Sequence, residues 1–110
     1  MRLFLSIVLA TTAQLGFAAC ERPATPTLPN GSTASQVQMI AGQQAVKEFI
    51  SSSEAYLECL TQAAKDAVST DSKADQQARL NDYNLSVEAM QTVASDFNQA
   101  IKTWKQANAN

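Results

Sequence analysis

The sequence predicts an all-α protein: an antiparallel two-helix hairpin resembling a coiled coil, with an extended proline-rich N-terminal strap along the first helix, after a signal peptide. Two observations predict the hairpin. From Thr33 onward the chain has no proline and a single glycine, and its apolar residues recur every three or four positions. A third observation predicts the strap: all three prolines lie between residues 20 and 32, spaced three apart as in a polyproline helix.

Residues 1–18 have the order of a secretory signal peptide. A positive start, Met1-Arg2, precedes an apolar run over residues 3–10 and a group of small residues before position 19. The run is shorter than the roughly 20 residues of a membrane-spanning helix. We therefore expect an exported protein, periplasmic or secreted, whose mature part has no transmembrane helix and begins with a strap over residues 19–32.

The processing site has an alternative. Phe17-Ala18-Ala19-Cys20 is similar to the lipobox of bacterial lipoproteins, with Phe where Leu is usual. Cleavage there would make Cys20 the lipid-bearing first residue, and the protein would be a membrane-anchored lipoprotein. Signal peptidase I and lipoprotein processing therefore both remain open.

The helical hairpin is expected over residues 33–110, with helices at about 34–69 and 72–107. Thr33-Ala34-Ser35-Gln36 has the form of a capping box and predicts the first start. Asp71 or Ser72 can cap the second helix. Two helices of about 36 residues, each ~54 Å long, joined by a short loop favour an antiparallel pair.

Each predicted helix carries one apolar seam with heptad spacing, which predicts the core. The seam of the second helix comprises Leu80, Tyr83, Val87, Met90, Ala94, Phe97, Ile101 and Trp104. The seam of the first comprises Met39, Gly42, Val46, Phe49, Ser53, Tyr56, Leu60, Ala63 and Ala67. Folding the hairpin about residue 70 places Gly42 opposite Phe97, a small residue against a large one.

The two cysteines, Cys20 and Cys59, predict a disulfide, because exported proteins mature in an oxidising compartment. An extended segment from residue 20 to 32 spans ~37 Å at about 3.1 Å per residue. The helix from Thr33 to Cys59 spans ~39 Å, so a strap running back along it brings the two sulfurs together. A lipid on Cys20 with a free thiol at Cys59, or two unpaired thiols, are the alternatives.

A pattern of sequence elements extends over nearly the whole mature chain. It comprises Cys20, Pro23, Pro26, Pro29-Asn30-Gly31, Tyr56-Leu57-Glu58-Cys59, Asn84, Val87, Met90, Phe97-Asn98 and Trp104-Lys105. In this the chain resembles a family of short exported proteins of Gram-negative bacteria, a domain of unknown function. Tyr83-Asn84 stands where that family has His-Asn. The resemblance implies a periplasmic or secreted helical protein and implies no activity.

Composition argues against catalysis and nucleic-acid binding. The chain has no histidine, the commonest general base. Without Arg2, seven basic residues remain beside ten acidic ones, a net charge of −3 (7 − 10), which cannot neutralise phosphates. Glu54 and Glu58 could share a cation, but two carboxylates alone make a weak site. We expect no enzyme, no cofactor and no metal; a small metal carrier or enzyme is the remote alternative.

One apolar edge lies beside the seam, on the side of the first helix away from Cys59. It comprises Ile40, Ile50, Leu57 and Ala64. Two helices alone rarely bury enough apolar surface to fold stably. We expect this edge to bind a second copy or another helical protein of the envelope, so that the protein is a non-enzymatic binding or structural module. The other interpretation is that the edge is the rim of a broad seam.

Overall fold

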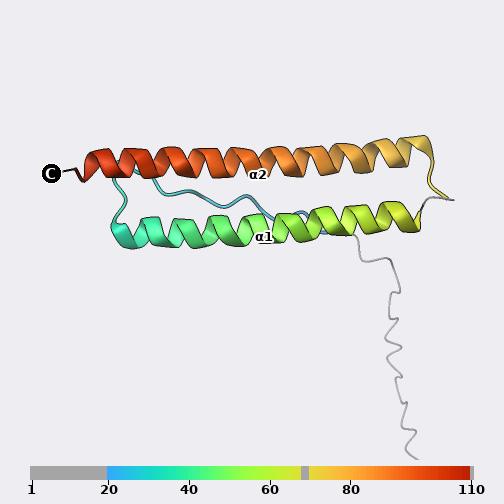
Figure 1. The fold of residues 1–110 in the computed structure, drawn as a ribbon, viewed down its shortest axis with the longest axis horizontal. Helices are drawn as coiled ribbons and strands as arrows, with labels where there is room; N and C mark the ends of the chain where they lie inside the picture. The colour runs from blue at the N-terminus through green and yellow to red at the C-terminus, as the bar shows by residue number, and fades with distance from the viewer. Residues whose placement is uncertain (1–19, 68–69, 110) are drawn as a thin grey trace, which may run out of the picture.

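The computed structural model describes residues 20–67 and 70–109 (Figure 1). The predicted signal peptide, the first residue of the predicted strap and the predicted helical residues 68–69 lie outside the described residues. Within the described part the chain forms two helices and no strand: α1, Gln36–Asp66, and α2, Lys73–Ala107. They lie antiparallel and side by side, with the N-terminal strap along them (Figure 1). The predicted all-α hairpin is confirmed.

The start of α1 lies two residues later than the sequence pattern predicted. Ser35 is the N-cap, and the capping box is Ser35 with Gln38: the Gln38 N–H donates to Ser35 Oγ at 3.2 Å, and the Ser35 N–H donates to Gln38 Oε1 at 2.8 Å. The predicted box at Thr33 is wrong because a turn already uses that backbone. The N–H groups of Thr33 and Ala34 donate to the Asn30 carbonyl, so the helix begins only after this turn.

The loop between the helices is longer than predicted, because α1 ends before residue 69 and α2 begins after residue 72. α1 ends at Asp66, and Ala67 caps it by donating its N–H to the Ala63 carbonyl at 3.1 Å. The carbonyl of Ala67 then accepts the N–H groups of Thr70 and Asp71. Ser72 is the N-cap of α2, accepting from the Asp75 N–H at 3.1 Å. Of the two predicted caps, therefore, Ser72 acts as the cap and Asp71 does not.

The strap follows the predicted path and ends in the predicted bond. Cys20 and Cys59 form a disulfide with a Cα–Cα distance of 5.7 Å. Along the strap every third side chain is half-buried, at Cys20, Pro23, Pro26 and Pro29, while most residues between them are exposed. A threefold polyproline helix presents one residue in three to the same side, so the proline spacing sets which side chains meet the hairpin.

The other end of the strap is fixed to the end of α2. The Trp104 indole N–H donates to the Ala34 carbonyl at 3.1 Å, across 70 residues of sequence. Gly31 is buried there, and a Cβ at this position would overlap the Ala100 carbonyl and crowd Thr103. A glycine is therefore required for the turn to lie flat on α2.

The core agrees with the predicted seam on α1 and differs from it on α2. The buried residues of α1 are Met39, Gly42, Phe49, Ser53, Tyr56 and Leu60, all members of the predicted seam. Those of α2 are Ser86, Val93 and Phe97, and only Phe97 was predicted. Leu80 and Tyr83, predicted as core, are 52% and 37% exposed. The buried stripe of α2 is turned toward the strap, because the strap supplies a third packing surface on that side.

Candidate functional site: the open face of the hairpin

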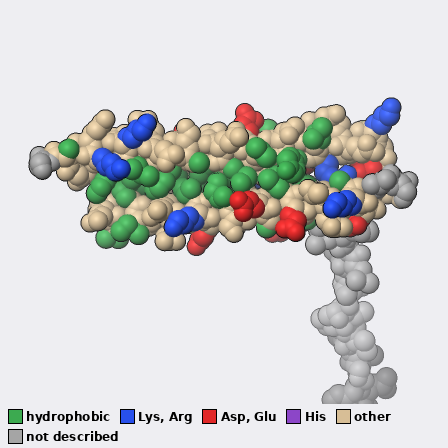
Figure 2. Space-filling model, in the orientation of Figure 1, with side chains coloured by type: hydrophobic (Ala, Val, Ile, Leu, Met, Phe, Trp, Pro, Cys, Tyr) green, Lys and Arg blue, Asp and Glu red, His purple; other side chains and the backbone are tan. Residues whose placement is uncertain are grey.

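The hairpin has two unlike faces, and only one of them is covered. The strap lies behind the two helices in the view of Figure 1, so Figure 2 shows the uncovered face. On this face a band of hydrophobic side chains runs between the helices, with charged side chains mostly along its margins (Figure 2). We call this surface the open face and the opposite one the strap face.

The middle of the strap packs closely on the hairpin because the hairpin presents small residues to it. A Cβ on Gly42 would lie 2.8 Å from the ring of Pro29 and 3.1 Å from Phe97 Cε2. Ser53 and Ser86 are both buried, and together with Phe49 and strap residues they enclose a cavity of about 10 Å³. The half-buried proline rings therefore fill this part of the groove. Hollows of about 390 Å³ beside Pro29 and about 500 Å³ beside the disulfide remain along the strap.

The open face is defined by two apolar rows with a spacing of seven residues. They are Ile50, Leu57 and Ala64 on α1, and Leu80, Val87, Ala94 and Ile101 on α2. Every member is half-buried except Leu80, which is exposed. Residues seven apart lie on one side of a helix, so each row follows the hairpin along its length. The side chains contact the core on one side, and no described residue covers their other side.

Three residues of the predicted edge on α1 lie together at the open face, and the fourth lies apart from them. Ile50, Leu57 and Ala64 are half-buried at the open face, whereas Ile40 is 52% exposed. Ten residues separate Ile40 from Ile50, which is not a whole number of turns at 3.6 residues per turn. Ile40 therefore points about 80° away from the row and lies on the outer side of α1.

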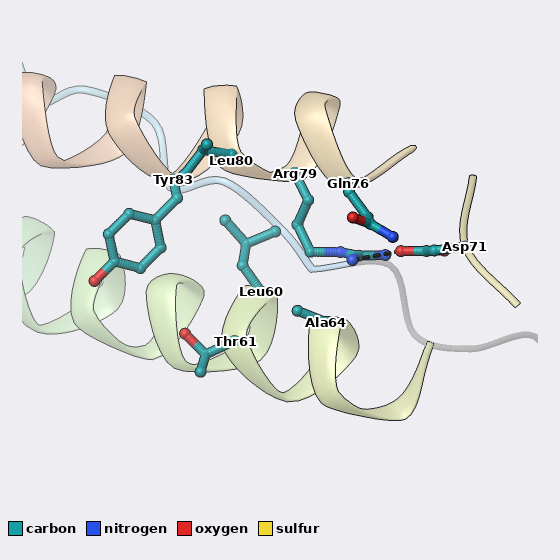
Figure 3. A pocket seen from close by; sticks show the side chains of 8 residues that line it. All are labelled: Leu60, Thr61, Ala64, Asp71, Gln76, Arg79, Leu80 and Tyr83. Carbon is teal, nitrogen blue, oxygen red and sulfur yellow. Dashed lines mark ion pairs between the residues drawn. The ribbon is translucent and has the colours of Figure 1, made fainter. Parts of the chain in front are cut away.

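A groove lies between the helices on the open face near the hairpin loop (Figure 3). Its volume is about 460 Å³, and its lining comprises Leu60, Thr61, Ala64, Asp71, Gln76, Arg79, Leu80 and Tyr83. Figure 3 shows Leu80 and Tyr83 from α2 above Leu60 from α1. The groove is therefore mainly apolar, with polar groups at the loop and hydroxyl groups from Thr61 and Tyr83 at the other end.

An ion pair closes the loop end of this groove. Arg79 Nη1 lies 2.6 Å from Asp71 Oδ2, and the two side chains are 20% and 13% exposed (Figure 3). Asp71 Oδ2 has no hydrogen bond of good geometry, so charge attraction rather than an aligned hydrogen bond holds the pair. With each charge compensated by the other, the groove has no free charge at this end to select an ionic ligand.

The other predicted positions have simple environments. Glu54 and Glu58 are both exposed on α1, and the described residues hold no group of three or more acidic or cysteine side chains close enough to share a metal ion. Neither described helix has a stretch both long and apolar enough to cross a membrane.

The α2 row of the open face was not predicted from the sequence, because its members were assigned to the core. The proline-rich segment could have indicated this row, since a strap can cover only one side of a seam and leaves the other side open.

The fold and site together define a class of protein: a helical hairpin whose N-terminal segment is tied back by a disulfide across one face. Comparisons with protein-family models, with curated proteins and with solved structures found no match.

Proposed function

We propose that the mature chain is exported, to the periplasm or beyond the cell, and acts there as a non-enzymatic binding or structural module that presents its open face to other helices. The observation that carries this proposal is the difference between the two faces. The chain covers one groove with its own strap and holds it by a covalent bond, while the opposite apolar rows have no cover from the described residues.

Export is supported by the disulfide together with the signal-peptide pattern. Disulfides persist outside the reducing cytoplasm, and the bond between Cys20 and Cys59 closes most of the N-terminal half of the mature chain. The bond also favours the form without a lipid anchor. A Cys20 sulfur that is bonded to Cys59 cannot at the same time carry the thioether of a lipoprotein.

A binding role is supported by the shape and chemistry of the open face. Its rows are apolar along the hairpin, and helix-in-groove recognition uses rows of this spacing. The absence of histidine from the chain removes the usual general base. The module therefore acts through contact area and not through a reacting group.

Export is tested with the tagged full chain in its native host. Cell fractionation should place the mature protein in the periplasm or the medium. Its intact mass should correspond to a chain that begins at Ala19 and should be smaller by two hydrogens than that of the dithiol form. Thiol alkylation should label it only after reduction. An acylated Cys20, which adds several hundred daltons, or a cytoplasmic dithiol would contradict the export part of the proposal.

Binding through the open face is tested by photo-crosslinking in intact cells. A photoreactive amino acid at Leu57 or Leu80 should yield discrete crosslinked products. The matched control is Ser51, which is exposed on α1 and lies on the outer side of the helix. Equal crosslinking from Ser51, or none from the open face, would overturn the proposed role.

A further inference from the structure

The open face has the dimensions of a dimer interface. α1 has 31 residues, which corresponds to ~47 Å at 1.5 Å per residue. Two packed helices, about 9 Å between axes and about 10 Å thick, are roughly 19 Å wide. The face therefore offers roughly 900 Å² per copy, and a stable complex needs about 800 Å² per partner. A single matching surface of the same length would be enough for specific association.

The chain itself carries such a matching surface. Within the hairpin Gly42 lies level with Phe97, and Ser53 lies level with Ser86 because both line one small cavity. Because the helices are antiparallel, moving one residue along α1 toward the loop corresponds to moving one residue along α2 toward its N-terminus. A rotation about a two-fold axis parallel to the helices preserves these levels and places α1 of one copy over α2 of the other.

At those levels the α1 row of one copy lies over the loop half of the α2 row of the other. Ile50 and Leu57 come close to level with Val87 and Leu80 of the second copy, whereas Ala94 and Ile101 come level with the more polar N-terminal part of its α1. A two-fold axis perpendicular to the helices gives a poorer match, because it must pair the α1 row with itself. When the two α1 rows are paired about Leu57, the two α2 helices overlap mainly near the loop. The end of α2 that carries Ile101 then extends beyond the second copy. In the first arrangement each α1 lies along the α2 row of the other copy, and the apolar contacts concentrate at Leu80 and Val87.

The charges at the margins of the open face favour a second copy over a strongly charged partner. The outer margin of α1 carries both signs, at Lys47, Glu54, Glu58 and Lys65, all exposed. Such a mixed margin does not select a partner of one sign, and at physiological salt, where screening extends over about 8 Å, its exposed charges repel a second copy only weakly. Of the exposed lysines of α2, Lys73 lies near the loop, whereas Lys102 and Lys105 lie together near the C-terminal end.

We infer that a second copy of this chain covers the open face. The two hairpins pack with their loops at the same end and form a four-helix bundle, in which the two straps lie on opposite outer sides. The inference rests on the proposed function, since it names the partner of the same face. It predicts that Leu80, the most exposed member of the apolar rows, is buried against Leu57 of the other copy.

Sedimentation equilibrium of the purified, disulfide-bonded mature chain tests the interface. We expect a dimer at about 50 μM. Leu80→Lys should weaken association at least about thirtyfold, because two copies of the charge enter the apolar interface. The matched control is Val37→Lys: Val37 is 76% exposed on the outer side of α1, and its replacement should leave association unchanged. Circular dichroism verifies that both variants fold.

A charge reversal tests the arrangement of the two copies. With both loops at one end, Lys65 of one copy lies level with Lys73 of the other, so like charges face each other at both margins. Lys73→Glu should therefore tighten the dimer roughly threefold to thirtyfold at low salt. The control Lys102→Glu changes the net charge equally but faces the neutral Gln36 of the other copy, and it should not tighten the dimer.

The outcomes separate this inference from the proposed function. A monomer at about 200 μM, or a dimer that Leu80→Lys leaves intact, overturns the inference. A dimer that Lys73→Glu does not tighten overturns the arrangement with both loops at one end. If the chain is monomeric while Leu57 and Leu80 still crosslink to other proteins in cells, the open face binds a different helical partner and the proposed function stands.

Discussion

Gly42 of α1 faces Phe97 of α2 across the hairpin, with the ring of Pro29 closing the third side. A Cβ on Gly42 would lie 3.1 Å from Phe97 Cε2 and 2.8 Å from two carbons of the Pro29 ring. One small residue thus lets two helices and the strap meet at a single point. The helix accepts a glycine here, at a cost of about 1 kcal/mol relative to alanine, because this contact requires it.

Gly42→Val should lower stability by about 2–3 kcal/mol, since the added side chain must push the Pro29 ring or Phe97 away. Urea denaturation followed by circular dichroism measures the change. Ala55→Val is the control: Ala55 is exposed on the same helix, and we expect the change to cost the difference in helix propensity, about 0.5 kcal/mol. Equal losses from the two variants would show that Gly42 makes no tight contact.

The disulfide should contribute about 4 kcal/mol of stability, as expected for a bond between residues 39 apart. Its main effect is to restrict the unfolded chain. The double variant Cys20→Ser with Cys59→Ser should therefore show a lower urea midpoint than the oxidised protein. Reduced wild-type protein should resemble the double variant. A midpoint unchanged in both would mean that strap packing alone holds the fold.

Trp104→Phe should cost about 1–2 kcal/mol, because the ring is largely kept while the Ala34 carbonyl loses its indole donor. Trp104 is the sole tryptophan of the chain, so its fluorescence in the wild type reports directly on this contact. Emission should shift to longer wavelength when the strap is released by reduction. Unchanged emission on reduction would place Trp104 outside the region that the strap organises.

Ser53→Ala should raise stability by about 1 kcal/mol. Ser53 is fully buried, and its hydroxyl has no hydrogen-bond partner among the described residues. Alanine removes the desolvated polar group and has the higher helix propensity. Thermal unfolding measures the gain, with the exposed Ser52→Ala as a control for propensity alone. A loss of stability in Ser53→Ala alone would reveal a polar partner for this hydroxyl.

Arg79→Ala should destabilise the loop end by about 1–3 kcal/mol, because it leaves the largely buried Asp71 carboxylate without its counter-charge. Removing both charges, with Arg79→Met and Asp71→Asn together, should cost less than the single change. A double-mutant cycle in urea gives the coupling between the two residues. Strictly additive losses would mean that the pair does not interact in solution.

The helices, their order and the reach of the strap could be predicted because they depend on local chemistry. Proline spacing, capping residues and heptad periodicity act over a few residues, and chain length decides whether Cys20 can reach Cys59. The exact helix starts were less predictable. Ser35-x-x-Gln38 and Thr33-x-x-Gln36 are equivalent as sequence patterns, and the hydrogen bonds to the Asn30 carbonyl decided between them.

The sequence by itself determined a hairpin with one apolar seam, a strap and the disulfide that ties it. Only the tertiary structure decided which side of the seam the strap covers, and hence that Ser86 and Val93 are buried while Leu80 is exposed. The physical reason is that periodicity sets the angles between residues on one helix, whereas the rotation of that helix about its own axis depends on everything packed against it. The orientation of α2 about its own axis therefore decides which apolar side chains remain exposed on the open face.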